Sequence, residues 1–569
     1  MSKRRPAGVV GAILLLAALV LAGPLAAGGA AAHRAPRPSY HPGGRGDPPH
    51  GHHRPGYLQP SVTVNPIVGD RAQPNIVVFM TDDARDDDVR FMPNVQRLIG
   101  QQGVRFVNAF APQPLCCPAR ASFLSGEYSQ NHHVWSNASP WGFHSFDDRH
   151  TIATWLHAAG YNTVMLGKYL NGYGIETTRT GGPSLHYVPP GWTDWRASVD
   201  AHLGSSPLTG GTYRYYDATL NVNGRLQAHR GQYQTGVFAR QSEQIFRNYA
   251  RSPQPFFFWD SFVAPHQGLP HERDDPAPAR SANGRLRAFG TPARPRAVWG
   301  RFNAAIPHAP GFRGEGNVSD KPFYIRRLTP MSATDQRSVT QITRERAESL
   351  SLVDRAIQKM IAVLKQTGQL GNTYIFFVSD NGYFLGEHRM RQGKILPYET
   401  SLRVPVLVRG PGIPRGQVRT DPFTMIDFAP TFLQIAGVPR PTMIDGVSML
   451  GVAKHGDRGW TRGILTDTGP RYVRGGGVGE SSNFLRPGNG PSPLRFTIGV
   501  RTRDYLYTQV VTGWRELYDL RTDPGELVNL VHRRSERHVV AAMAQELARL
   551  RSCHGASCSR PLPPLLTSP

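Results

Sequence analysis

Cysteine is scarce in this chain, which has only 4 among its 569 residues. Cys116 and Cys117 are adjacent and precede a proline, which is not the Cys-x-x-Cys spacing of a zinc knuckle, and no second pair lies nearby to complete one. The pair could still be a redox or metal site. Cys553 and Cys558 lie near the C-terminus, where an oxidising compartment would let them close a small loop. We expect a structural disulfide there, with two free thiols as the alternative.

Long apolar runs are absent beyond the N-terminus. Residues 1–32 have the pattern of a secretory signal peptide, with basic residues at 3–5, an apolar run from Val9 to Leu21 and an alanine-rich cleavage zone. The alternative is an uncleaved membrane anchor, but the apolar run is shorter than the roughly twenty residues that a spanning helix needs. The sequence therefore predicts a secreted, extracellular protein with no stable membrane anchor.

Lysine is rare although the chain is strongly basic. The formal net charge is +24, and only seven of the 65 basic residues are lysine. This arginine bias is typical of a GC-rich genome and needs no selection for charge. No Lys/Arg-rich block and no basic stripe with interleaved aromatics marks a nucleic-acid module, so we expect no nucleic-acid partner. The positive field would suit another polyanion equally well.

The chain changes character near residue 70. Residues 33–70 are rich in proline, glycine and histidine and are predicted to form a disordered linker. From residue 75 onward, short apolar runs typical of strands buried on both faces alternate with helical stretches such as Ala347–Thr367. The predicted strands cover residues 75–80, 163–166, 256–262, 374–378 and 404–408. This alternation predicts an α/β sheet, whose ligands collect beyond the carboxyl ends of the strands.

Oxygen-rich side chains follow two of the predicted strands. Asp82 and Asp83 come just after the first strand, and Asp380 and Asn381 come just after the strand at 374–378. Three carboxylates and an amide oxygen are hard ligands that suit calcium or magnesium. Each pair alone is weak evidence, since Asp-Asp and Asp-Asn-Gly also make ordinary turns. Because both pairs end buried strands, the sequence predicts a divalent cation site at this edge of the sheet.

The segment from Cys116 to Arg120, Cys-Cys-Pro-Ala-Arg, resembles the Cys-x-Pro-x-Arg element of the type I sulfatases. The resemblance implies that a formylglycine-generating enzyme oxidises Cys116 to Cα-formylglycine, and that the hydrate of this aldehyde supplies the oxygen that attacks sulfur. It also implies that residue 116 and the four strand-end residues bind one cation, usually Ca²⁺. The implied fold is alkaline-phosphatase-like: a large, mixed, mostly parallel sheet flanked by helices, with a smaller C-terminal antiparallel sheet plus helix.

Further cationic side chains match the same family. Lys168 and Lys394 resemble its sulfate-binding lysines, and His266 resembles the histidine that contacts the bridging ester oxygen. Arg120 would lie one helical turn after Cys116, where it can steady the aldehyde hydrate. Alone, each would be an ordinary surface charge or a satisfied polar group. Together they are expected to offset charge on the sulfuryl group, with His266 or Lys394 protonating the leaving alcohol and Asp380 or a neighbouring carboxylate acting as the base.

One position departs from the family. Many sulfatases carry Lys-x-His, whose histidine is thought to assist the final elimination of sulfate, but this chain has Leu170 two residues after Lys168. We expect His132 or His133 to take this role, with His133 as the candidate site residue. His388 is a weaker candidate for a substrate contact.

Several longer motifs are similar to the N-acetylglucosamine-6-sulfatase branch, and the similarity runs from about Pro74 to Leu450. The resemblance implies a catalytic domain at 71–455 and a C-terminal subdomain at 456–569. The arginine-, proline- and glycine-rich insertion at about 270–335 has no counterpart that we can identify. Since substrate choice usually resides in such loops, the sugar specificity is the weakest part of the resemblance.

The expected function is therefore a secreted sulfatase acting on a sulfated small molecule or glycan, such as N-acetylglucosamine-6-sulfate or an aryl sulfate. Two alternatives remain open. One is a phosphate or phosphonate ester hydrolase of the same superfamily. The other is a polyanion-binding protein without turnover, which would have no need of an oxidisable cysteine.

Overall fold

The computed structural model describes residues 73–200, 210–280, 286–312, 315–469 and 497–567. The predicted signal peptide (1–32) and linker (33–70) lie outside these residues. Within them, no helix is both long and apolar enough to cross a bilayer.

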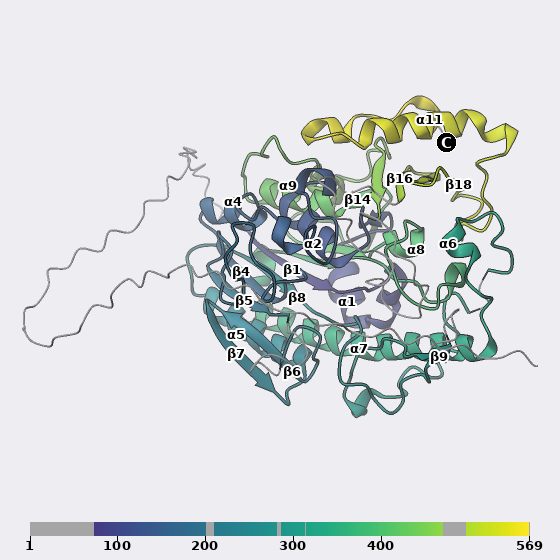
Figure 1. The fold of residues 1–569 in the computed structure, drawn as a ribbon. Helices are drawn as coiled ribbons and strands as arrows, with labels where there is room; N and C mark the ends of the chain where they lie inside the picture. Colours follow the sequence, from purple (N-terminus) through teal and green to yellow (C-terminus); the bar gives the residue numbers. More distant parts are fainter. Residues whose placement is uncertain (1–72, 201–209, 281–285, 313–314, 470–496, 568–569) are drawn as a thin grey trace, which may run out of the picture. The chain divides into compact units, whose positions relative to one another are not determined.

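A ten-stranded sheet forms the centre of the described chain (Figure 1). Its four middle strands, β11, β1, β8 and β4, are mutually parallel, while β12, β6 and β7 add antiparallel pairs toward the edges. The strands in spatial order are β13 (Gln417–Arg419), β2 (Val104–Phe106), β12 (Val406–Arg409), β11 (Thr373–Ser379), β1 (Asn75–Thr81), β8 (Phe256–Ser261), β4 (Asn162–Lys168), β5 (Asp194–Ser198), β6 (Asp217–Val222) and β7 (Arg225–Arg230).

Helices cover both faces of this sheet, which explains why its central strands are mostly apolar. In β1, Ile76, Val78 and Met80 pack with the helices on one face, and Val77 and Phe79 pack with those on the other. The first face carries α2 (Cys116–Ser125), α4 (Ile152–Ala158) and α9 (Phe428–Ile435); the second carries α1 (Pro93–Val95), α5 (Gln234–Tyr249) and α7 (Ala333–Gln366) (Figure 1).

The five predicted strands are present, with one difference. The last strand begins at Val406 rather than residue 404 and runs antiparallel to β11. Pro405 has no N–H to donate to a ladder, so regular pairing starts after it. The helix predicted at 347–367 is longer than expected: α7 begins at Ala333, where the Ser332 side chain accepts a hydrogen bond from the Asp335 N–H.

A second, four-stranded antiparallel sheet follows in the C-terminal part, as predicted. It consists of β15 (Ile464–Asp467), β16 (Thr497–Arg501), β17 (Tyr505–Val510) and β18 (Arg515–Asp519), and α11 (Arg537–Leu550) packs on it. Its buried Val500 and Leu517 share a hydrophobic cluster with Phe110 and Tyr128, which precede and follow α2. The second sheet therefore shares a core with the segments that flank α2. The domain boundary at residue 455 stays a prediction.

Short elements complete the described chain. The small sheets pair β3 (Ala109–Phe110) with β14 (Phe423–Thr424) and β9 (Ala279–Arg280) with β10 (Leu286–Arg287). The remaining short helices are α3 (Ser129–His132), α6 (Phe323–Arg326), α8 (Glu399–Leu402) and α10 (Leu450–His455). The insertion at 270–335 contributes β9, β10, α6 and the first residues of α7.

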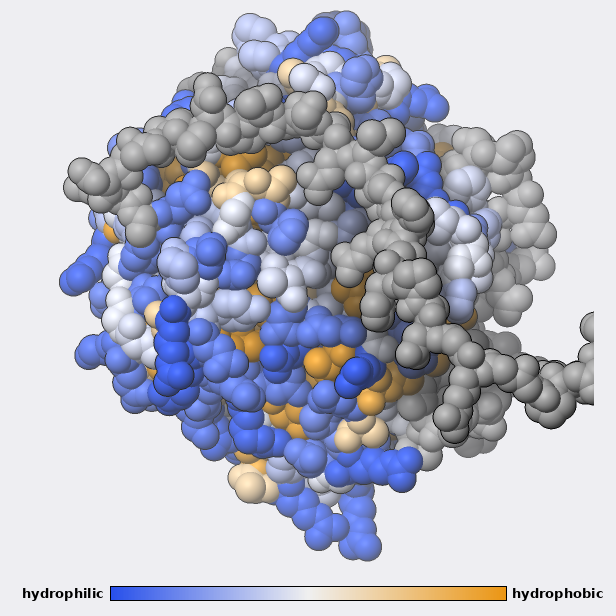
Figure 2. Space-filling view, turned by 90° about the vertical axis from the view of Figure 1, so that its left-hand side faces the viewer, coloured by the Kyte–Doolittle hydropathy of each residue, from blue (hydrophilic) through white to orange (hydrophobic). Residues whose placement is uncertain are grey.

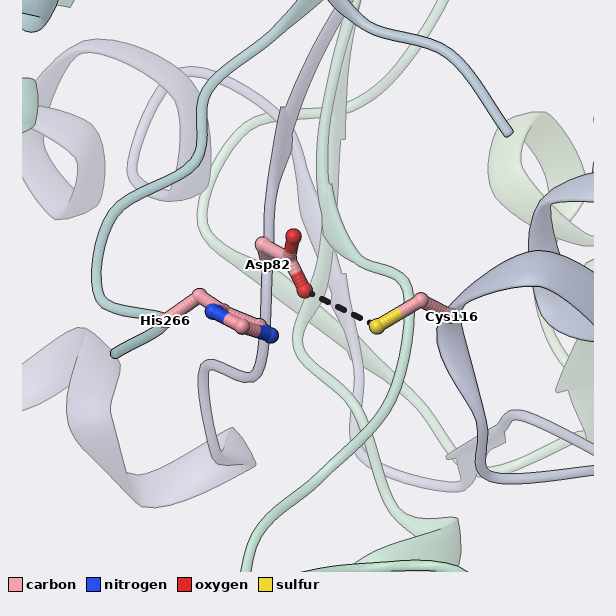
Figure 3. A group of neighbouring side chains, drawn as sticks. All are labelled: Asp82, Cys116 and His266. Atoms are coloured by element: carbon pink, nitrogen blue, oxygen red, sulfur yellow. Dashed lines mark hydrogen bonds between the residues drawn. The ribbon is translucent and has the colours of Figure 1, made fainter. Parts of the chain in front are cut away.

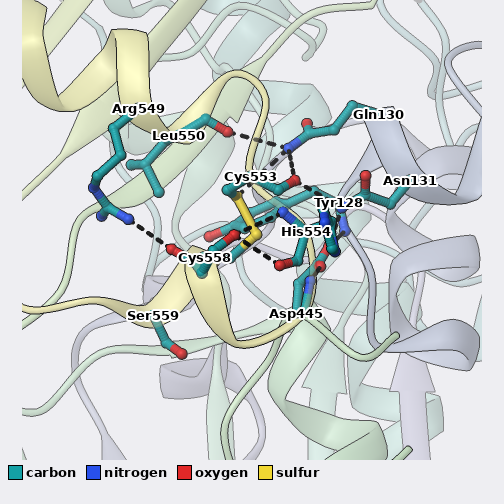
Figure 4. The surroundings of a disulfide bond; sticks show 12 residues. Tyr128, Gln130, Asn131, Asp445, Arg549, Leu550, Cys553, His554, Cys558 and Ser559 are labelled. Carbon is teal, nitrogen blue, oxygen red and sulfur yellow. Dashed lines mark hydrogen bonds between the residues drawn. A yellow bond between two sulfur atoms is a disulfide. The ribbon is translucent and has the colours of Figure 1, made fainter. Parts of the chain in front are cut away.

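The predicted disulfide between Cys553 and Cys558 is present just after α11 (Figure 4). Around it, Gln130 and Asn131 donate their side-chain amides to the Cys553 carbonyl, and Asp445 accepts from Asn131 and from the Gly555 N–H. The disulfide closes the C-terminal turn, and these hydrogen bonds hold that turn against α3.

Candidate active site

The carboxyl ends of β1 and β11 bring four buried polar side chains together. Asp82 and Asp83 follow β1, and Asp380 and Asn381 follow β11, which pairs in parallel with β1 along its whole length. All four side chains are fully buried. The Asp83 N–H donates to Asp380 Oδ1 over 3.1 Å, and Asn381 Nδ2 donates to Asp83 Oδ1 over 2.6 Å. The geometry therefore has the convergence that the strand-end argument predicts.

This cluster has the donor set of a hard cation. One oxygen each from Asp82, Asp83 and Asp380 lies within 4.8 Å of the others. Asp83 Oδ2 and Asn381 Oδ1 are buried and accept no hydrogen bond. Unsatisfied buried oxygens are costly, and a bound divalent ion would satisfy them. The residues present thus fit a calcium or magnesium ion.

Cys116 begins α2 and faces the cluster. Figure 3 shows its side chain, Asp82 and His266 converging from three separate segments. Its Sγ lies 3.3 Å from Asp82 Oδ1 and receives a hydrogen bond of 2.8 Å from Lys394 Nζ. Burial, reinforced by the Asp82 charge, raises the pKa of the Cys116 thiol well above its usual value. Unmodified Cys116 is therefore a thiol, which is a poor nucleophile.

Arg120 lies one turn further along α2 and is completely buried. Its Nε donates to Asp380 Oδ2 over 2.8 Å, and its Nη1 donates to the Lys168 carbonyl and to Ser261 Oγ over 2.8 and 2.7 Å. Nη2 lies 3.6 Å from Asp82 Oδ2. Arg120 thus connects the ends of β1, β4, β8 and β11 and fixes the carboxylates, and none of these contacts involves Cys116 itself.

Lys168 is the last residue of β4, and its ammonium is bonded to Asp82 Oδ2. Burial would lower the pKa of Lys168, but the charge of Asp82 raises it well above the usual value, so the ammonium stays protonated. Burial would likewise raise the pKa of Asp82, but Lys168, His266 and Arg120 lower it. The two side chains form an ion pair at the base of the site.

His266 lies in the loop after β8. Its Nδ1 is 2.6 Å from the Gln267 carbonyl, which can only accept, so Nδ1 carries a proton. Its Nε2 lies 3.9 Å from Asp83 Oδ2 and therefore points into the site. The Lys394 ammonium bonds to Asp83 Oδ1 as well as to Cys116.

The two histidines expected to replace the missing Lys-x-His residue lie differently. His132 is buried, its Nδ1 accepts from the Val134 N–H, and its Nε2 donates to Ser122 Oγ over 2.9 Å. Burial lowers the pKa of His132 to about 3, so it is neutral and structural. His133 is exposed, and within the described residues no hydrogen bond or ion pair joins its side chain to Cys116. Leu170 packs in the apolar core.

His388, a weaker sequence candidate for substrate contact, is buried between two carboxylates and does not face the cluster.

Three residues that the sequence did not indicate also contribute to the site. Tyr213 covers Lys168, with Nζ 5.0 Å from the ring centroid, and its ring lies 4.6 Å from that of His266. Asn171 donates to the Tyr213 hydroxyl over 2.6 Å, and Ser261 holds Arg120. Ser261 is the last residue of β8 and lies within the strand predicted at 256–262, and Asn171 closely follows Lys168, but nothing in the local sequence marks Tyr213 as a site residue.

The family model for sulfatases matches residues 74–438. This chain belongs to the sulfatase family. Human N-acetylglucosamine-6-sulfatase is 30% identical over 527 residues, which cover 86% of this chain and 86% of that protein. The extracellular sulfatase SULF-1 homolog of Drosophila melanogaster is 32% identical over 430 residues, covering 73% of this chain. This sulfatase-family chain spans only 35% of that relative's length.

Solved structures support the same fold. A structure of BT4656 with its substrate D-glucosamine-2-N,6-O-disulfate superposes with a TM-score of 0.64 at 22% identity, covering 84% of this chain and 97% of that one. The phosphonate monoester hydrolase of Agrobacterium radiobacter superposes with a TM-score of 0.57, also at 22% identity, covering 84% of this chain and 95% of that one. The predicted alkaline-phosphatase-like architecture is confirmed, whereas these likenesses leave the substrate open.

Proposed function

We propose that this chain is a sulfatase that hydrolyses sulfate esters of sugars, such as N-acetylglucosamine-6-sulfate, or aryl sulfates. The observation that carries the proposal is the setting of Cys116. A buried thiol with a raised pKa, lying between Asp82 and the Lys394 ammonium, is unsuited to act as a nucleophile itself. It is well placed for a modified residue that presents an oxygen to an anionic ester.

The modification is the oxidation of Cys116 to Cα-formylglycine by a formylglycine-generating enzyme, which is this chain's partner during maturation. A divalent cation, Ca²⁺ or else Mg²⁺, held by Asp82, Asp83, Asp380, Asn381 and residue 116 would lower the pKa of a hydrate hydroxyl and offset sulfuryl charge. The orphan oxygens of Asp83 and Asn381 support that assignment.

The chain's own side chains then have separate roles in the reaction. A carboxylate of the cluster, Asp380 in our proposal, accepts the proton of one hydrate hydroxyl, and that oxygen attacks sulfur while the ester oxygen leaves. The ammoniums of Lys168 and Lys394 stabilise charge on the sulfuryl oxygens, while Arg120 holds the carboxylates in place.

Two proton transfers complete the cycle. His266 or Lys394 gives a proton to the departing alkoxide, for which the inward-facing Nε2 of His266 is well directed. The second hydrate hydroxyl next loses its proton, the aldehyde C=O forms again, and the sulfate leaves with both electrons of its bond to carbon. We retain His133 as the proposed helper in this elimination, because His132 has both ring nitrogens engaged.

The location that we propose for the protein rests on its sequence. We propose that the chain is secreted through the signal peptide at 1–32, without a stable membrane anchor and without a nucleic-acid partner. The names of the Drosophila melanogaster relative and its Caenorhabditis elegans counterpart, both extracellular sulfatases, support this location.

A second candidate function is phosphonate or phosphate ester hydrolysis, favoured by the likeness to the Agrobacterium radiobacter enzyme. One experiment separates the two. The mature protein is assayed with matched sulfate, phosphate and phosphonate esters, while mass spectrometry of the Cys116 peptide detects the aldehyde. We expect the sulfate ester to be turned over fastest and residue 116 to be formylglycine.

Cys117 supplies the matched control for this experiment. It is also a buried thiol, and its Sγ donates a hydrogen bond to the Asn171 carbonyl over 3.8 Å. Cys116→Ala should abolish turnover, whereas Cys117→Ala should retain it within about fivefold, since removing one small buried group costs little catalysis. Full activity with an unmodified Cys116 thiol would refute the proposed mechanism.

A further inference from the structure

The loop that carries Lys394, residues 383–394, is a closed hairpin. Phe384 pairs with Gly393, and the Phe384 N–H donates to the Gly393 carbonyl over 2.6 Å. At the tip, the Gly386 N–H donates to the Met390 carbonyl over 2.7 Å. Because Lys394 directly follows this closure, the position of its ammonium depends on how the hairpin is held.

His388 lies at the tip of this loop and is almost fully buried. Its Nδ1 is 2.8 Å from Glu315 Oε2, and its Nε2 is 3.8 Å from Glu526 Oε2. Its ring also stacks on Tyr398, with centroids 4.3 Å apart. The backbone of His388 has a φ of 49°, a left-handed conformation that a non-glycine residue adopts only when its surroundings hold it there.

The two carboxylates come from distant parts of the chain. Glu315 belongs to the insertion at 270–335, and Glu526 follows β18 of the C-terminal sheet. Each is anchored further: Lys321 Nζ lies 3.0 Å from Glu315 Oε1 and donates to the Leu527 carbonyl over 2.8 Å. Glu526 accepts from the Glu399 N–H. The insertion and the C-terminal sheet are thus tied to one another at the tip of the loop.

We propose that His388 is a positioning residue: as a cation between Glu315 and Glu526, it fixes the loop that places the Lys394 ammonium beside Cys116. This gives the insertion a role in the reaction although Glu315 does not reach the site. The kinetic consequence rests on the proposed sulfatase function, whereas the structural one does not.

The electrostatics of the group support a charged imidazole. Burial would lower the pKa of His388, but its bonds to Glu315 and Glu526 raise it to about 9. Lys321 faces Glu315, and Glu399 and Arg403 face Glu526. Removing one partner of a buried ion pair leaves the charge of the other partner without compensation. We therefore expect the loop to change position when one of these side chains is removed.

Other contacts hold the loop as well, so losing the His388 contacts should shift the loop and not unfold the chain. Arg85 Nη2 lies 2.9 Å from Glu387 Oε1, and Arg389 and Arg391 donate to backbone carbonyls of the insertion. Substitutions at His388 or its partners should therefore leave the chain folded and loosen residues 383–394.

Hydrogen exchange of the full-length protein tests the positioning claim without any substrate. We expect amides of residues 383–394 to exchange about tenfold faster in His388→Gln, Glu315→Gln and Glu526→Gln, since local opening then needs less free energy. The matched control is Glu345→Gln, a buried carboxylate of α7 that contacts Arg294 and Gln341, not the loop. Unchanged loop exchange in all three variants would overturn the proposal.

A double-mutant cycle tests whether the effect passes through Lys394. His388→Gln should lower kcat for a sulfate ester about tenfold with little change in KM, because charge stabilisation in the transition state is lost. In a Lys394→Met background it should lower the residual kcat no further. Independent, multiplying effects would refute the coupling. A wild-type protein inert toward sulfate esters would refute the proposed function, and the exchange experiment would still decide the positioning claim.

Discussion

At the scale of single residues, the site is a balance of buried charges. Asp82, Asp83 and Asp380 face the side chains of Lys168, Lys394 and Arg120, and all six are at most 2% exposed. Removing one member of such a group leaves a partner uncompensated in a medium that solvates it poorly. A substitution at one of these carboxylates therefore lowers the stability of the fold as well as altering the site. The role of each carboxylate must be tested by a measurement that a loss of stability alone would not change.

For Asp83, such a measurement is the stabilisation of the protein by a bound cation. Asp83→Asn should abolish the rise in thermal midpoint that added Ca²⁺ gives the wild type, because it removes a carboxylate from the proposed ligand set. For the wild type, binding at about a hundred times the Kd should add about 2.7 kcal/mol of stability. The midpoints are measured by calorimetry after chelation, with and without Ca²⁺ and Mg²⁺.

The matched control for Asp83 is Asp260→Asn, which changes a buried carboxylate of β8 outside the cluster. It should keep the full cation response. If Asp83→Asn keeps that response too, or if chelated wild type retains its midpoint and its activity, the strand-end cluster does not hold the cation.

The site residues that the sequence predicted share one property: each lies near a strand end or in a contiguous motif. Asp82, Asp380 and Lys168 follow or end buried strands, and parallel pairing places those ends at one edge. Tyr213 could not be predicted, because it enters from a connection between strands and its role depends on packing against Lys168 and His266. The environment of His388 depends on tertiary contacts with two distant segments, which no local pattern records.

At the scale of elements, β8 contains an unusual residue for a central strand. Asp260 lies between β1 and β4, opposite Phe79 and Leu166, and is completely buried. Its Oδ2 accepts from Ser242 Oγ over 2.8 Å, and its Oδ1 has no hydrogen-bond partner. Burial raises the pKa of Asp260 to about 8, so the folded protein keeps this carboxyl protonated at neutral pH.

This buried carboxyl predicts a pH dependence of stability. The folded pKa of about 8 exceeds the ordinary value of 3.8, so the proton is fully bound in both states only well below pH 3.8. Between these two values only the folded state holds the proton, so stability falls as pH rises, by up to about 6 kcal/mol in total. Asp260→Asn cannot titrate, and its thermal midpoint should fall less steeply than that of the wild type between those pH values.

The measurement is the difference in midpoint between variant and wild type across this pH range, since other groups titrate equally in both. Asp217→Asn, which changes a partly exposed carboxylate of β6, should give a constant difference. Parallel curves for Asp260→Asn and wild type would show that Asp260 is ionised throughout, and the assignment would be wrong.

Elements were predictable where hydrophobic periodicity was strong. The four middle strands are mostly apolar, and their positions follow from the sequence within about two residues. The antiparallel direction of β12 did not follow, because direction is set by the connection and not by composition. The first part of α7, residues 333–346, was missed since it buries polar side chains such as Glu345 and Arg346, whose partners lie in the insertion and just after β1.

At the scale of the whole molecule, the surface is charged and carries few exposed apolar side chains. The face in Figure 2 is mostly hydrophilic, with hydrophobic residues in small separate areas. Among the described residues, the exposed large hydrophobic side chains are Ile175, Val418, Val511, Leu527, Val528 and Leu565. With a net charge of +24, the protein's long-range interactions should be governed by electrostatics.

This net charge should affect the binding of polymeric substrates more than that of small ones. A sulfated polysaccharide meets the field of the whole protein, whereas a small aryl sulfate interacts mainly with the buried site. Raising ionic strength shortens the Debye length from about 10 Å at 0.1 M to about 3 Å at 1 M, which screens the surface field far more than the buried contacts. We therefore expect kcat/KM for a sulfated polysaccharide to fall about tenfold across this range through KM, while that for the aryl sulfate changes less than about twofold. Equal losses for both substrates would show that salt acts at the site itself, and the surface charge would then have no part in choosing a polymeric substrate.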